Sequence, residues 1–193
     1  APPEAREGRR GRHVPAEAEF WLFIMGDLTI FGIFFGLWAW SYAQHPGLFE
    51  AGRATMSQSI GLAETLTLIT SSAALAAGLN LARAQDWPKT LRCYLIAGGF
   101  GALFVLLKIV EYSRHLTAGE SPAVNDFFMY YFVFTGIHLL HVLVGMLAMS
   151  VVARSMRHGA PRRPGIAVLE GVGLYWHMVD VLWVVLFSLI YLI

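Results

Sequence analysis

The chain has 193 residues, of which 56% are hydrophobic and 14% charged, with a formal net charge of +1 and a mean hydropathy of +0.57. This composition excludes an ordinary solvated surface, and the length leaves room for one compact bundle but not for a separate water-soluble catalytic domain. The single cysteine, Cys93, excludes an intramolecular disulfide and a CxxC metal site. The chain is therefore predicted to be an integral membrane protein.

We predict an all-α bundle of five transmembrane helices behind a short polar tail. The tail, residues 1–16, is rich in Pro, Gly and Arg, which indicates a flexible segment rather than a targeting peptide. Residues 17–193 form the single membrane domain. Each span is long enough to cross a hydrocarbon core roughly 30 Å thick. The predicted spans cover about residues 20–43, 60–81, 90–113, 127–153 and 166–193.

The first span holds one charged residue, Asp27, and a Gly32-x-x-x-Gly36 pair on the opposite side of the helix. We expect both sides to face protein, because a buried carboxylate is costly unless it is paired or protonated, and glycines allow close helix packing. Two interpretations of Asp27 stay open. It is either a proton relay near the inner surface or a neutral or paired acid that holds two helices in register.

The second and third spans carry charges that can meet. Glu64 lies in the second span, which follows an amphipathic linker, and Lys108 and Glu111 lie in the third. Lys108 and Glu111 can pair at i,i+3, and with Glu64 they are predicted to form a structural clamp.

The fourth span contains no Asp, Glu, Lys or Arg but carries His138 and His141, and the last span carries His177 and Asp180. We predict that these four side chains form a hydrogen-bonded joint between the two helices, because polar groups in a membrane need protein partners. The alternative is that they supply ligands to a metal or haem. Tyr191, near the end of the last span, is interpreted as an interfacial anchor.

The loop charges predict the orientation of the bundle. Lys and Arg number four in the tail, three at the second turn and four at the fourth, against Arg53 and Arg114 on the other side. The positive-inside rule then places the N-terminus inside and the C-terminus outside. In that orientation Asp27 lies in the inner half, the histidines and Asp180 lie near the midplane, and the clamp lies toward the outer face.

Five stretches of the chain resemble subunit III of the haem-copper oxidases in its short five-helix form. The similarity is collinear from Phe20 to Ile193, and its two most specific stretches belong to the fourth and fifth spans. The stretches are FWLFIMGD (20–27), LTLITSS (66–72), KIVEY (108–112), FTGIHLLHVLVG (134–145) and YWHMVDVLWVVLF (175–187). The fourth span and residues 170–180 are most similar to the branch associated with nitric oxide reductases.

The resemblance implies a non-catalytic accessory subunit of a respiratory-chain oxidoreductase, multi-pass in a bacterial cytoplasmic membrane. It would pack beside a catalytic subunit holding haem and copper or iron, with other subunits and lipids as partners, no nucleic acid, and no cofactor of its own except bound phospholipid. In the family the acid at the position of Asp27 is usually Glu and is linked to proton uptake and to stability of the catalytic site. Relatives commonly carry Asn at the position of Glu64.

The main interpretation is an accessory subunit of a cytochrome c oxidase, and three alternatives stay open. The first is an accessory subunit of a nitric oxide reductase in denitrification. The other two are a stand-alone membrane metal or haem protein and a proton carrier. The chain shows no internal repeat, which argues against a carrier built from inverted halves.

Overall fold

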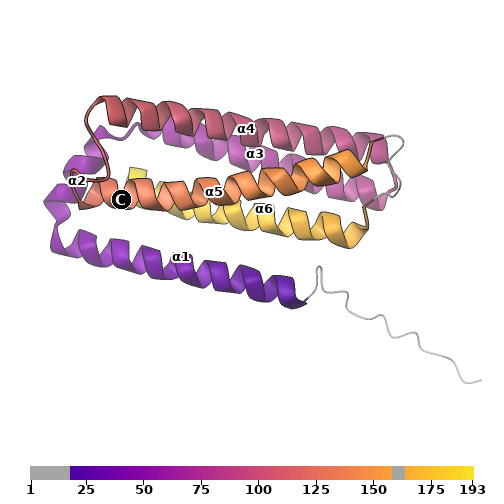
Figure 1. Cartoon of the computed structure of the whole chain (residues 1–193), viewed down its shortest axis with the longest axis horizontal. Helices are drawn as coiled ribbons and strands as arrows, with labels where there is room; N and C mark the ends of the chain where they lie inside the picture. The colour runs from indigo at the N-terminus through magenta and orange to yellow at the C-terminus, as the bar shows by residue number, and fades with distance from the viewer. Residues whose placement is uncertain (1–17, 158–163) are drawn as a thin grey trace, which may run out of the picture.

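The computed structural model describes residues 18–157 and 164–193 (Figure 1). The predicted tail, Arg162 and Arg163 lie outside this part of the chain. The helical segments are α1 (Ala18–Gln44), α2 (Pro46–Thr55), α3 (Gln58–Arg83), α4 (Trp87–Thr117), α5 (Asp126–Ser155), α6 (Ile166–Phe187) and the π-helical turn η1 (Ser188–Leu192). Within these two described ranges, five helical spans are long and apolar enough to cross a membrane, which confirms the predicted all-α fold.

Capping residues set where α4 and α5 begin. The Asp86 carboxylate accepts a hydrogen bond from the Lys89 amide at 3.3 Å, and the Asn125 side chain accepts one from the Phe128 amide at 3.0 Å. Each cap satisfies a backbone N–H that has no partner within its helix. After α4, Gly119 has φ of +81°, a conformation that glycine adopts without a steric penalty.

The connection predicted to be an amphipathic linker is a short helix, α2. Pro46 occupies its first turn, where the missing N–H costs no hydrogen bond. Phe49 is 2% exposed, and its ring lies 4.9 Å from that of Trp38 and 5.9 Å from that of Phe127. These aromatic contacts fix α2 across one end of the bundle, against α1 and α5 (Figure 1).

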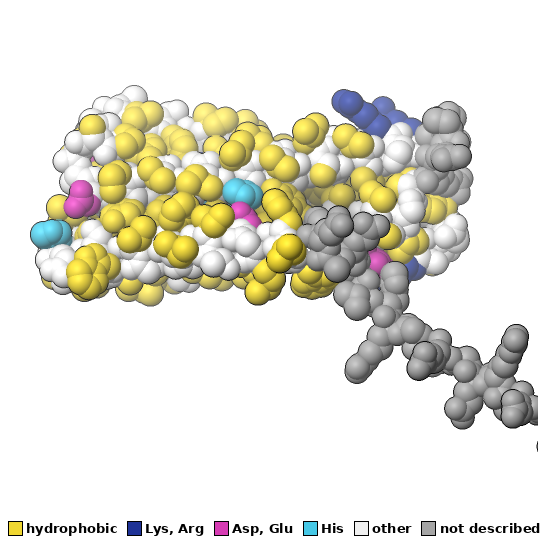
Figure 2. Space-filling model, turned by 60° about the horizontal axis from the view of Figure 1, so that its bottom comes forward, with side chains coloured by type: hydrophobic (Ala, Val, Ile, Leu, Met, Phe, Trp, Pro, Cys, Tyr) yellow, Lys and Arg dark blue, Asp and Glu magenta, His cyan; other side chains and the backbone are white. Residues whose placement is uncertain are grey.

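Helices α3, α4, α5 and α6 pack against one another, and α1 lies on the outer side of this core (Figure 1). Helix α3 packs beside α4, and α6 contacts both α3 and α5. The two tryptophans Trp176 and Trp183 of α6 have no exposed surface. In the most apolar stretch of each span, 56% of the residues are buried for the span formed by α6 and η1, but only 17% for α1. Helix α1 is therefore peripheral, and Figure 2 shows a mainly hydrophobic outer face.

Both sides of α1 are predicted to face protein, but only one of them packs against the described part of this chain. Its inner side packs through Ile24, Phe31 and Trp38, each at most 5% exposed. A Cβ atom added at Gly32 or Gly36 would meet no atom within 4 Å of the part of the chain that the structure describes. The predicted close-packing glycine side therefore makes no close contact with the described residues of this chain.

Gly145 of α5 lets the Trp176 ring of α6 approach the α5 backbone. A Cβ at this position would lie 2.7 Å from Trp176 Cε3 and 2.9 Å from Cζ3. Because both residues are buried, the indole has no free space into which it could move. Glycine at residue 145 therefore determines how closely α5 and α6 pack.

We predict that Gly145→Ala lowers stability by about 1–3 kcal/mol, the usual cost of adding volume to a packed core. The matched control is Gly99→Ala on α4, where an added Cβ meets no atom within 4 Å. That change should leave the midpoint of thermal unfolding in one detergent unchanged or raised, because Ala favours the helix. Equal midpoints for Gly145→Ala and the unmodified chain would contradict the packing described here.

Candidate functional site

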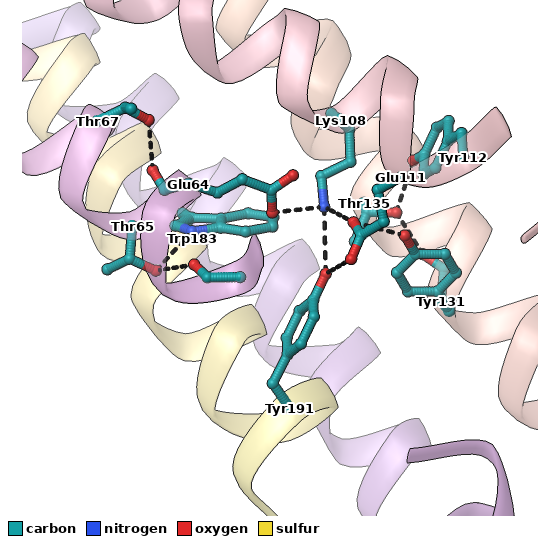
Figure 3. Close-up of polar contacts among 11 residues, drawn as sticks. Glu64, Thr65, Thr67, Lys108, Glu111, Tyr112, Tyr131, Thr135, Trp183 and Tyr191 are labelled. Atoms are coloured by element: carbon teal, nitrogen blue, oxygen red, sulfur yellow. Dashed lines mark hydrogen bonds and ion pairs between the residues drawn. The ribbon is translucent and has the colours of Figure 1, made fainter. Parts of the chain in front are cut away.

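Lys108 lies buried between two carboxylates inside the bundle (Figure 3). Its Nζ is 2.6 Å from Glu111 Oε2 on the same helix and 2.9 Å from Glu64 Oε2 on α3. The side chains of all three residues are at most 1% exposed. The contact with Glu111 has hydrogen-bond geometry, whereas the contact with Glu64 has only the distance of an ion pair. The structure thus brings together the three residues predicted to form a clamp.

Two tyrosines complete what we call the Lys108 cluster, which consists of Glu64, Lys108, Glu111, Tyr131 and Tyr191. Tyr131 on α5 donates to Glu111 Oε2 at 2.8 Å, and Tyr191 on η1 donates to Glu111 Oε1 at 2.7 Å. Lys108 Nζ also donates to the Tyr191 hydroxyl at 3.3 Å (Figure 3). The cluster therefore joins α3, α4, α5 and η1 through charged groups.

Sequence reasoning missed the role of Tyr191. Its position near the chain end suggested an interfacial anchor, but its side chain is fully buried against Glu111. Helical periodicity already places Tyr191 on the polar side of the last span, but it does not show which neighbouring helix that side meets. Tyr191 itself lies in the π turn of residues 188–192.

The Trp183 ring lies next to the cluster. Lys108 Nζ is 4.5 Å from the ring centroid, a distance suited to a cation–π contact. The indole Nε1 donates to Thr65 Oγ1 at 3.1 Å, and Thr65 donates in turn to the Gly61 carbonyl at 2.8 Å. The ring is thereby held over the ammonium group and shields it from the surroundings of the bundle.

Asp27 pairs with His141 and does not lie at a separate level nearer the inner face. The distance from His141 Nε2 to Asp27 Oδ1 is 3.2 Å, and the side chains are 18% and 12% exposed. The predicted placement of Asp27 and His141 at different depths is therefore wrong, because loop charges orient the helices but do not set the vertical offset of α1 against α5. A paired acid that holds α1 to α5 is the geometry expected of the structural interpretation, and proton relay stays a prediction.

The four residues predicted to join α5 and α6 do not form a single joint. Of the four side chains, that of His138 has a hydrogen bond between these two helices, from Nε2 to the Val179 carbonyl oxygen at 3.1 Å, and the backbone carbonyl of His141 accepts one from Tyr175 at 3.2 Å. His141 reaches α1, and His177 pairs with Ser72 of α3. Residues three positions apart point roughly 60° away from each other on a helix, so adjacent histidines reach different neighbours.

Asp180 lies with Ser72 and His177 along a groove between α3 and α6. Farther along these two helices, Arg83 Nη2 is 2.8 Å from Glu170 Oε1. The polar residues of α6 therefore serve contacts with α3 as well as with α5.

The donor set does not fit a common metal or haem ligand field. In residues 18–157 and 164–193, no group of three or more His, Cys, Asp or Glu side chains is placed to hold a metal ion. His138 contacts α6, His141 contacts α1, and His177 and Asp180 lie along the groove between α3 and α6, while the Nε2 atoms of His138 and His141 already contact protein oxygens. In this arrangement the four residues cannot coordinate one ion together.

Comparison with known proteins identifies the family. A family model described as cytochrome c oxidase subunit III matches residues 16–193. The chain belongs to the cytochrome c oxidase subunit III family. It is 31% identical over 176 residues to a cytochrome c oxidase subunit 3 from Thermostichus vulcanus, a match that covers 89% of this chain and 84% of that relative.

Further relatives in the subunit III family carry the names of quinol oxidase subunits. The cytochrome bo(3) ubiquinol oxidase subunit 3 of Pseudomonas putida is 27% identical over 179 residues, covering 90% of this chain and 84% of the relative. The probable quinol oxidase subunit 3 of Staphylococcus aureus is 27% identical over 180 residues, with 90% and 87% covered. These names give no support to the nitric oxide reductase alternative, and the five apolar helices make this subunit III homologue a multi-pass membrane protein.

We predict that Lys108→Met destabilises this subunit III homologue by about 3–5 kcal/mol, the usual cost of leaving a buried charge unpaired. The matched control is Lys89→Met, which breaks another i,i+3 pair, with Asp86 at 2.7 Å. The hydrogen bond from Lys89 lowers the pKa of Asp86, but this pair lies at the surface and solvent screens it.

The measurement is the thermal unfolding midpoint of the two variants in the same detergent. Lys108→Met should lower it strongly and Lys89→Met hardly at all. Similar small shifts for both variants would show that the Lys108 cluster does not stabilise the bundle.

Proposed function

We propose that this chain is a non-catalytic accessory subunit of a haem-copper oxidase, in which it stabilises the catalytic subunit. The observation that carries this proposal is the family match over residues 16–193, which covers all five long helices. The polar chemistry of the bundle supports it, because Lys108, His138 and His141 are engaged in contacts between helices.

The redox chemistry belongs, in this proposal, to a partner subunit that holds haem and copper or iron. This chain contributes packing, and its own non-protein ligand would be phospholipid on the apolar flank. The outer face offers such a flank, since α1 and α5 expose large apolar residues such as Leu22, Ile33, Trp40, Leu140 and Leu147. In a membrane, these side chains contact either lipid or a partner helix.

The proposed location is the cytoplasmic membrane of a bacterium with the N-terminus inside. The basic residues support this orientation, because Arg83, Lys89, Arg92, Arg154 and Arg157 belong to helix ends and turns on the side where α1 begins. Lys and Arg side chains gather at one end of the molecule in Figure 2. Positive residues of this kind are retained on the cytoplasmic side.

Asp27 would assist proton entry in this proposal. Its Oδ1 contacts His141, whereas its Oδ2 is buried without a hydrogen bond from the described residues. A half-buried carboxylate beside an imidazole forms a pair that can hold and release a proton. The Asp27–His141 pair joins the peripheral helix α1 to α5, so it lies near the apolar face of α1 and α5 that is proposed to contact the partner subunit.

Co-purification tests the proposed function. When the membrane is solubilised in a gentle detergent and this chain is captured through a tag, a haem-containing oxidase subunit should elute with it in a constant ratio. A tagged membrane protein of similar size from the same cells is the control for nonspecific capture. Isolation of this chain alone, or with a transporter and no haem protein, would contradict the proposal.

We predict that Asp27→Asn leaves the haem and copper content of the complex unchanged but lowers oxidase turnover several-fold at high pH. At high pH protons are scarce, so the loss of a proton-collecting carboxylate should limit turnover most there. The measurement is turnover against pH at matched subunit content. Asp126→Asn, an exposed acid in the first turn of α5, is the control.

Two other results would give Asp27 a different role. Loss of haem or copper in Asp27→Asn would indicate a role in assembly. An unchanged pH profile together with an unchanged active lifetime would leave the Asp27–His141 pair as a packing contact.

A further inference from the structure

A polar pocket opens at the end of the bundle where α2 meets the connection between α4 and α5. Its volume is about 270 Å³, far more than the roughly 10–15 Å³ that one water molecule requires. Its polar side chains come from the end of α2, the turn before α3, the end of α4 and the loop that follows. They are Thr55, Ser57, Glu111, Arg114, His115 and Glu120.

Glu111 connects this pocket with the Lys108 cluster. It lines the pocket although its side chain is only 1% exposed, so the pocket ends at a carboxylate that is bonded to Lys108. At the same place His115 Nδ1 is 2.5 Å from Glu120 Oε2, and the His115 ring lies 5.4 Å from that of Tyr131. Water in the pocket therefore has a short route to the cluster.

The charges inside the cluster do not balance when both carboxylates are ionised. Two carboxylates face one ammonium group, and the side chains of Glu64, Lys108 and Glu111 are at most 1% exposed. The hydroxyl groups of Tyr131 and Tyr191 donate to Glu111 and are therefore neutral. An uncompensated negative charge in a buried site inside a membrane is costly, so one carboxyl group should hold a proton.

The hydrogen bonds decide which carboxyl group holds it. Glu111 accepts from Lys108, Tyr131 and Tyr191, which is the environment of an ionised carboxylate. Neither oxygen of Glu64 has a hydrogen bond from the described residues, although Oε2 lies 2.9 Å from Lys108 Nζ. Protonation therefore costs less at Glu64 than at Glu111, because it breaks no hydrogen bond at Glu64.

We propose that the Lys108 cluster binds one exchangeable proton on Glu64 and exchanges it with water through the pocket at Glu111. In uptake, a hydronium ion in the pocket gives its proton to Glu111 and becomes water. Glu111 passes a proton to Lys108 while Lys108 gives one of its own to Glu64. Lys108 and Glu111 end with their starting charges, and only Glu64 changes state.

Titratable or charged groups of the neighbouring elements face Glu64, Lys108 and Glu111 and would influence their protonation. They comprise a tyrosine on the same helix, two groups on α5, one on η1 and three in the pocket. They are Tyr112, Tyr131, His138, Tyr191, Arg114, His115 and Glu120. Asp27 belongs to a different pair with His141, so the proposal extends beyond the function proposed above and does not depend on that carboxylate.

Infrared spectroscopy of the intact oxidase complex tests the protonation of Glu64. At neutral pH the complex should show a protonated carboxylic acid band that shifts in D₂O and is absent from Glu64→Gln. Because Gln is close in shape to a neutral Glu, this variant should assemble normally. Glu111→Gln is the matched comparison and should impair assembly, since it removes the ionised partner of Lys108.

Two results of this experiment would overturn the assignment. One is a carboxylic acid spectrum that is the same in Glu64→Gln and the unmodified complex. The other is failure of Glu64→Gln to assemble, which would show that an ionised Glu64 is required.

The rate of hydrogen–deuterium exchange at the same band tests the route. Glu120 is the pocket carboxylate outside the cluster, and in this route it passes protons from solvent to the pocket water at Glu111. A positioned acid–base group accelerates proton transfer by a factor on the order of 100 or more, so Glu120→Gln should slow the exchange by at least roughly tenfold. Glu50→Gln is the control, because Glu50 is an exposed acid at the same end that does not line the pocket. Equal exchange rates in Glu120→Gln and Glu50→Gln would rule out the proposed route.

Discussion

The rest of the bundle depends on how the buried ammonium group of Lys108 is paired with its neighbours. A charge inside a membrane protein is tolerated only where other protein groups replace the water that it loses. Here the replacement comes from Glu64 of α3, Glu111 of α4 and Tyr191 of η1, with Tyr131 of α5 bonded to the same carboxylate. Any shift of one of these helices would leave a charge or a hydroxyl group without its partner, so the cluster fixes their mutual positions.

The remaining polar contacts have the same character but join different helices. Arg83 with Glu170 and Ser72 with His177 connect α3 to α6, and the Asp27–His141 pair connects α1 to α5. Helix α1 is held mainly by this pair and by aromatic packing, and most of its surface faces away from the core. A packed core of α3, α4, α5 and α6 with a peripheral apolar helix suits a subunit that supports a larger membrane complex.

Much of the fold could be predicted from the sequence because composition and charge placement leave few choices. Long apolar runs require helices, and the i,i+3 spacing of Lys108 and Glu111 already places both groups on one side of α4. Partners on other helices were harder to predict. Helical periodicity shows which residues share a side but not the rotation or vertical offset of neighbouring helices. It therefore predicts one joint for His138 and His141, whose side chains contact different helices, and it does not show that Tyr191 meets Glu111.

The metal content and visible absorption spectrum of this chain, once it is separated from its partner and purified, test the central claim most directly. The account predicts a chain without haem absorption and without stoichiometric copper or iron, while the partner subunit retains both the haem bands and the metals. Haem or a stoichiometric metal that remains with this chain after separation would contradict its assignment as a non-catalytic accessory subunit.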